Sequence, residues 1–124
     1  MEPLILAGTE DTPDVYFNDE QGVFKISGNS FSDDPFTTFS PIFNWLDIYF
    51  QNPLKETHVE IKMSYLNTAS SKQITEILFK FQTIIEKSDV KILWYYDKLD
   101  EDMEFEGQTL KHIVSNLNFE MVGY

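Results

Sequence analysis

The chain has 124 residues, of which 42% are hydrophobic and 15% aromatic, so it can bury enough apolar surface to offset its folding entropy, which excludes disorder. Its 21 acidic and 9 basic residues give a net charge of -12, which opposes binding to nucleic acid or to anionic membranes. The absence of cysteine excludes disulfides and thiolate chemistry and is typical of a cytoplasmic protein. The length predicts a single domain over residues 1–124.

The first part of the chain predicts antiparallel sheet. A short apolar run at Leu4–Leu6 ends at Gly8; it is brief and has no basic flank, so we expect no signal peptide. We expect no membrane insertion either, because no other stretch is long enough to span a bilayer. Residues 15–17 and 23–27 are rich in β-prone side chains and flank a polar segment that ends in glycine. This pattern is typical of a hairpin with a longer loop.

The first helical pattern follows a turn-rich segment. Asp33 or Asp34 in front of Pro35 is a typical helix start. Pro41 leaves two alternatives, because an interior proline removes one backbone hydrogen bond: a bent helix from Pro35, or a shorter helix that Ser40 caps. We favour the longer helix because one apolar stripe runs through it. The stripe predicts these inward side chains: Phe36, Phe39, Phe43, Leu46 and Phe50.

Strands and helices alternate in the second half of the chain. Apolar side chains at every second position predict a strand with one covered face: Val59, Ile61, Met63 and Tyr65. The next helix has the clearest pattern in the sequence, with Glu76 and Lys80 expected to pair on its outer side. Its inward stripe consists of Ile74, Ile77, Leu78, Phe81, Ile84 and Ile85.

A strand is then predicted at residues 90–96, a helix at 103–115 and a short strand at 119–122. The helix would direct four side chains inward: Phe105, Leu110, Ile113 and Val114. This order of elements predicts an α/β layered domain with a mixed sheet, an N-terminal antiparallel hairpin and about three helices. Its later crossovers should be right-handed.

Candidates for catalysis or metal binding are few. His58 and His112 are isolated and fit solvated or capping side chains better than zinc ligands. The acidic run at residues 97–106 lacks the glycine and the alternating carboxylates of a calcium loop, and no glycine-rich phosphate loop follows a strand. We therefore expect a protein that is not an enzyme and that uses no metal or cofactor.

The most informative segment is a hydroxyl-rich elbow at residues 65–72, between a predicted strand and the clearest helix. Asn67, Thr68 or Ser70 would cap free N–H groups of that helix, an interaction worth about 1 kcal/mol. Alternatively, Thr68 is a phosphoacceptor, and its phosphate would add roughly -1.5 to -2 charges near the positive end of the helix dipole. A third possibility is an anion or small-molecule site at the helix start.

A partner-binding surface around Thr68 would consist of Tyr65, Leu66, Asn67, Ser70 and Lys72. Lys72 would lie in the first helical turn, close enough to pair with a phosphate on Thr68. Three further aromatic residues fit either this surface or the core: Trp45, Trp94 and Tyr96.

A strand that leads into an Asn-Thr elbow and a helix resembles the STAS domain of anti-sigma-factor antagonists, although Ala69 and Ser70 follow Thr68 where that family has Ser-Gly. The chain more closely resembles the SiaC-like family of bacterial regulatory phosphoproteins. The matching positions are Gly8-Thr9, Thr12-Pro13, Gly28, Ser30, Trp45, Tyr65-Leu66-Asn67-Thr68, Ser70, Lys72, Trp94 and Tyr96-Asp97. It departs from the pattern at Ala69, where serine is expected, and at Ser71, where an apolar residue is expected.

The resemblance implies that Thr68 is phosphorylated by a histidine-kinase-like serine/threonine kinase and dephosphorylated by a PP2C-type phosphatase. It also implies that the unphosphorylated protein binds a diguanylate cyclase and so acts in cyclic-di-GMP and biofilm signalling. Two alternatives remain: partner switching of the anti-sigma-factor-antagonist type, and a structural adaptor in which Thr68 is no more than a helix cap.

Overall fold

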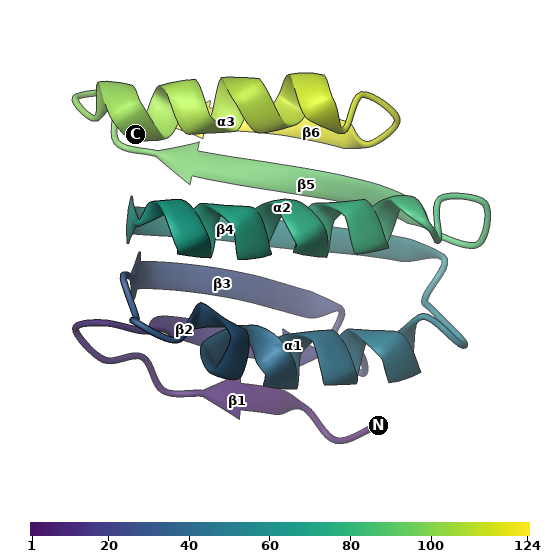
Figure 1. Ribbon diagram of the computed structural model, residues 1–124. Coiled ribbons are helices and arrows are strands. Elements are labelled where there is room, and N and C mark those ends of the chain that lie inside the picture. Colours follow the sequence, from purple (N-terminus) through teal and green to yellow (C-terminus); the bar gives the residue numbers. More distant parts are fainter.

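The computed structural model describes residues 1–124 as a six-stranded sheet and three helices (Figure 1). The strands lie side by side in the order in which they occur in the chain: β1 (Leu4–Leu6), β2 (Pro13–Asn18), β3 (Val23–Ser30), β4 (Glu56–Leu66), β5 (Asp89–Tyr96) and β6 (Asn118–Gly123). The helices connect the strands from β3 onward: α1 (Pro35–Tyr49), α2 (Thr68–Gln82) and α3 (Glu101–Ile113).

Strands β1 to β3 pair antiparallel, and β3 to β6 pair parallel. The predicted α/β class, mixed sheet, N-terminal hairpin and three helices are thus confirmed. The short apolar run at Leu4–Leu6 adds one further edge strand to the hairpin.

All three helices lie on one face of the sheet (Figure 1). The core fills the space between the helices and the sheet. Alternate strand residues point toward the helices and are fully buried, among them Phe17, Ile26, Ile61 and Ile92. The other face of the sheet is open, and ion pairs link its neighbouring strands. Lys25 lies 3.4 Å from Glu60, and Lys91 lies 3.1 Å from Glu120.

Helix α1 runs from Pro35 through Pro41, so the longer helix is confirmed, and Asp34 caps it. Ser40 is not a cap, because its hydroxyl donates to the Phe36 carbonyl within the helix. The predicted stripe is only partly correct: Phe36 is 74% exposed. The buried side chains of α1 are Phe39, Ile42, Trp45, Leu46 and Tyr49.

Helix α2 confirms most of the clearest helical prediction, with Ile74, Ile77, Leu78 and Phe81 buried. The predicted stripe extends too far, because Ile84 and Ile85 follow the end of the helix and Ile85 is 40% exposed. Its expected Glu76–Lys80 pair is wrong. Lys80 instead reaches the neighbouring helix α1, with its Nζ 2.9 Å from the Asp47 carboxylate.

Helix α3 confirms only part of the predicted inward stripe, because Leu110 and Val114 are buried but Phe105 and Ile113 are not. Gly107 is buried, and a Cβ atom at this position would lie 2.5 Å from Trp94 Nε1 and 2.7 Å from Met121 Cε. This glycine therefore lets α3 approach the indole of Trp94, which donates to the Met103 carbonyl at 3.1 Å. Phe105 consequently points away from the core and is 73% exposed, as is Ile113 at 45%.

The end of β4 also departs from strict alternation. Opposite the single step from Gly28 to Asn29, β4 advances two residues, from Met63 to Tyr65, which is a β-bulge. Gly28 adopts a φ of 97°, a conformation that glycine reaches without steric cost. Because of the bulge, Tyr65 is 51% exposed and does not continue the buried row of Val59, Ile61 and Met63.

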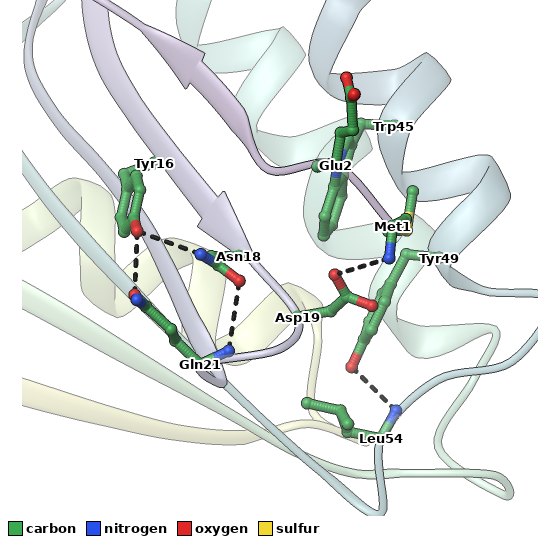
Figure 2. A network of polar contacts seen from close by, with 9 residues as sticks. All are labelled: Met1, Glu2, Tyr16, Asn18, Asp19, Gln21, Trp45, Tyr49 and Leu54. Atoms are coloured by element: carbon green, nitrogen blue, oxygen red, sulfur yellow. Dashed lines mark hydrogen bonds and ion pairs between the residues drawn. The ribbon is translucent and has the colours of Figure 1, made fainter.

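The first residues of the chain are attached at the opposite end of the molecule from the start of α2 (Figure 1). Figure 2 shows the Trp45 indole, whose N–H donates to the Glu2 carbonyl at 2.8 Å. The Met1 nitrogen lies 3.6 Å from the Asp19 carboxylate in the β2–β3 turn. These contacts hold β1 against α1 and the hairpin.

Candidate functional site: the elbow between β4 and α2

Asn67 connects the two elements of the elbow, because it directly follows β4 and caps α2. Its backbone N–H donates to the Ser30 carbonyl at 2.9 Å, so the chain stays attached to β3 until it turns. Its side-chain oxygen accepts from the Ser70 N–H at 2.8 Å. This bond satisfies one of the free N–H groups at the helix start, as expected for an N-cap.

Thr68 is the first residue of α2, and its side chain is exposed. Asn67, not Thr68, caps the helix, so the structure contradicts the alternative in which Thr68 is a helix cap. No group of the chain forms a hydrogen bond with the Thr68 hydroxyl. This hydroxyl is therefore free to react or to bind at the positive end of the helix dipole, where α2 has no acidic side chain in its first turn.

Ser70 lies in the interior. Its side chain is fully buried, and its hydroxyl forms a 2.7 Å hydrogen bond with that of Ser30 in β3. This contact fixes the first turn of α2 to the sheet from behind. Ser70 thus supports the elbow and contributes no side-chain surface to it.

An aromatic pair borders the elbow. Tyr65 and Phe31 are 51% and 40% exposed, and their ring centroids lie 5.5 Å apart in an edge-to-face arrangement. Such a pair contributes about 0.5–1.5 kcal/mol beyond its buried area. Leu66 is half-buried and packs against the core. Sequence reasoning missed Phe31 because it lies in a segment assigned to a turn, although an aromatic residue there is a usable signal.

The N-terminal loop supports Phe31. The backbone N–H of Phe31 donates to the Asp11 carbonyl at 3.0 Å. Asp11 lies in a loop that is closed by a second hydrogen bond, in which the Thr9 hydroxyl accepts from the Thr12 N–H at 3.1 Å. A Cβ atom on Gly8 would lie 2.8 Å from the Asp14 backbone nitrogen, so this position needs glycine. Residues that are distant in sequence thus meet at the end of the sheet where β3 and β4 finish.

Helix α3 contributes an acidic side chain to the elbow. The Ser71 hydroxyl donates to the Glu106 carboxylate, and both side chains are partly buried. Lys72 is exposed on the next position of α2 and forms no ion pair within the chain. The start of α2 therefore carries one free cation, Lys72, and contacts one anchored carboxylate, Glu106 of α3.

The remaining sequence candidates lie elsewhere. Trp94 is fully buried and Trp45 nearly so; both belong to the core, and Tyr96 packs against it. His58 lies exposed on the open face of β4, and His112 in the last turn of α3. No three potential ligands gather closely enough for a metal ion, and none of the helices has both the length and the apolarity to cross a lipid bilayer.

The shifted pKa values also lie outside the elbow. Hydrogen bonds from Thr37 lower the pKa of Asp34, the cap of α1. Burial raises the pKa of Tyr49, and burial with the nearby Glu104 carboxylate raises that of Tyr96. The chemistry of the elbow thus depends on an exposed hydroxyl and on a helix start.

The model of the SiaC family of regulatory phosphoproteins matches residues 6–124. The chain belongs to this family. An uncharacterised protein of Pseudomonas aeruginosa strain UCBPP-PA14 is 24% identical over 102 residues, which cover 82% of this chain and 81% of that protein.

Solved structures of SiaC from Pseudomonas aeruginosa have the same fold. One matches with a TM-score of 0.84 at 19% identity over 100% of both chains. A crystal structure of the diguanylate cyclase SiaD with its activator SiaC matches with a TM-score of 0.88 at 20% identity, covering 98% of this chain and 99% of that chain. The SiaC-like fold is thus confirmed, while the likeness to STAS domains stays a prediction.

Proposed function

We propose that phosphorylation of Thr68 switches the binding of this protein to a partner, and that the partner is a diguanylate cyclase. The observation that supports this proposal best is the exposed Thr68 hydroxyl, which the helix does not need because Asn67 provides the cap. The partner class is suggested by the SiaC relative, which is described as the activator of the diguanylate cyclase SiaD.

The physical basis of the switch is the cost of burying a phosphate. The exposed faces of Tyr65 and Phe31 beside Thr68 form an apolar surface that a partner can cover. A phosphate on Thr68 carries roughly -1.5 to -2 charges at neutral pH, and a partner packed over it must remove its water or form new ionic bonds. The unphosphorylated form is therefore the one that binds.

The proposed function needs no catalytic group in this chain, which we place in the cytoplasm as one regulatory domain over residues 1–124. A histidine-kinase-like serine/threonine kinase would add the phosphate, and a PP2C-type phosphatase would remove it. Tyr65, Leu66, Asn67 and Lys72 would contact the partner, together with Phe31. Ser70 would act from the interior by holding the first turn of α2 in place.

The first test is the intact mass of the protein from its native cell, with and without phosphatase treatment. We expect a phosphatase-sensitive phosphate that maps to Thr68. The second test compares the binding of a diguanylate cyclase of the same cell to the parent chain, to Thr68→Val and to chains with phosphothreonine encoded at position 68 or 109. Thr109 is a matched control, because it is an exposed threonine on another helix.

We expect the parent, Thr68→Val and the phosphothreonine-109 chain to bind, and the phosphothreonine-68 chain to lose binding by at least tenfold. Equal binding of all four chains would refute the switch. Phe31→Ala and Tyr65→Ala should each weaken binding by about 1–2 kcal/mol, as expected for aromatic residues at an interface. Ile48→Ala provides the control, since Ile48 is 57% exposed in the last turn of α1, away from the elbow.

A further inference from the structure

We infer that Glu106 opposes a phosphate on Thr68, and that Ser71 holds the Glu106 carboxylate in position to do so. The inference rests on the function proposed above, because it concerns the regulation of the same residue. Glu106 would thereby favour the unphosphorylated state of the protein.

The geometry follows from the contact between α2 and α3. The Ser71 hydroxyl donates to the Glu106 carboxylate, which places this negative charge beside the first turn of α2. Thr68 and Ser71 are three residues apart in the helix and are therefore neighbours on its surface, with Cβ atoms about 5–6 Å apart. A phosphate on Thr68 would thus lie on the order of one Debye length, roughly 8 Å at physiological salt, from the carboxylate.

Two charges of opposite sign would act on this phosphate. Lys72 is exposed on a flexible side chain, one helical turn after Thr68, and attracts it. Glu106 is partly buried and anchored by a hydrogen bond, so its repulsion is less screened by water and salt. The carboxylate cannot turn away without losing its bond to Ser71.

Ser71 is one of the two positions at which this chain departs from the SiaC-like pattern, which leads us to expect an apolar residue there. An apolar side chain cannot donate a hydrogen bond to Glu106. The departure therefore has a physical consequence in this chain, because it attaches a carboxylate to the elbow.

The experiment measures the phosphate directly and needs neither kinase nor partner. Phosphothreonine is encoded at position 68, and the ³¹P chemical shift is followed from pH 4 to pH 8. A carboxylate about 8 Å away should change the second dissociation constant of the phosphate about two- to fourfold, from Coulomb's law with surface-like dielectric constants and salt screening. The comparison uses Glu106→Gln, Ser71→Ala, Lys72→Met and Glu86→Gln.

We expect Glu106→Gln to lower the pKa of the phosphate by this amount, and Ser71→Ala to lower it less, because the carboxylate is then present but not anchored. Lys72→Met should raise the pKa. Glu86→Gln is the matched control: Glu86 is an exposed carboxylate beyond the far end of α2, about 20 Å away along a helix of 15 residues, and its removal should leave the pKa unchanged.

The inference is overturned if Glu106→Gln titrates like the parent, or if Glu86→Gln shifts the pKa as much as Glu106→Gln. A lower melting temperature of Glu106→Gln without a change in the phosphate pKa would also overturn it, since the Ser71 contact would then serve packing alone. The proposed function fails by a different result, namely cyclase binding that ignores the phosphate on Thr68.

Discussion

Replacing Asn67 and Thr68 separately by alanine tests the division of roles at the elbow. In the structure, Asn67 caps α2 through its bond to the Ser70 N–H, whereas the Thr68 hydroxyl bonds to no group of the chain. Asn67→Ala should therefore reduce the stability of the fold, and Thr68→Ala should leave it nearly unchanged. Asn67→Asp should restore the cap and add a favourable charge at the helix start.

The expected size follows from the single bond that is lost. Removing an asparagine cap costs about 1 kcal/mol, within a range of roughly 0.5–2 kcal/mol. With an unfolding entropy of about 2.1 cal/mol/K per residue, a chain of 124 residues should lose about 4 °C in melting temperature per kcal/mol. Thr68→Ala exchanges an exposed side chain at the first helical position and should change the melting temperature by less than about 2 °C.

Circular dichroism melts and urea titrations of the four proteins provide the measurement. The m-values should agree, because the folded state and its buried area are unchanged. If Thr68→Ala lost as much stability as Asn67→Ala, the threonine would be a structural residue. Its hydroxyl would then not be free for phosphorylation.

Two further predictions concern the rest of the fold. Gly107→Ala should destabilise the protein by about 1–3 kcal/mol in urea titrations, because the added methyl group would collide with Trp94. Alanine has the higher helix propensity, so a gain in stability would contradict this packing. The folded-state pKa of Asp34 lies below its unfolded value, so its contribution to stability is present above the unfolded pKa, near 4, and disappears as the pH falls through the folded pKa. Melting temperatures of Asp34→Asn, which caps without a charge, should therefore fall less than those of the parent on acidification, and parallel curves would refute the assignment.

The strands and the order of elements were predictable from sequence because alternation and turn residues act locally. Which face of a helix is buried was less predictable, since α1 and α3 have apolar side chains on more than one side. In α3 the deciding residue is Gly107, whose missing side chain lets Trp94 approach, so Phe105 is left outside. A buried glycine contributes nothing to an apolar stripe, so the pattern placed Leu110 and Val114 correctly but wrongly added Phe105 and Ile113.

The elbow was predictable in position but not in the role of each residue. Three neighbouring polar side chains fitted a cap equally well on sequence grounds, and the structure assigns them to three environments. The Asn67 side chain accepts a hydrogen bond from an N–H group of the first helical turn, Thr68 faces solvent, and Ser70 is buried against Ser30. The contributions of Phe31 and Glu106 depend on contacts between elements distant in the chain, which no local pattern contains.

The way in which the elbow is held determines how a switch there can work. Bonds from Asn67 and Ser70 to Ser30 fix the first turn of α2 to the centre of the sheet, where strands pair on both sides of β3 and β4. A partner therefore meets a surface that is already ordered, and the binding free energy is not reduced by the entropy cost of ordering it. For the same reason, a phosphate on Thr68 should act through its own charge and hydration rather than by unfolding the helix, whose dipole favours it. The phosphorylated chain should thus keep the melting behaviour of the parent within a few degrees while losing its partner, and a large loss of stability on phosphorylation would show that the switch acts through the fold.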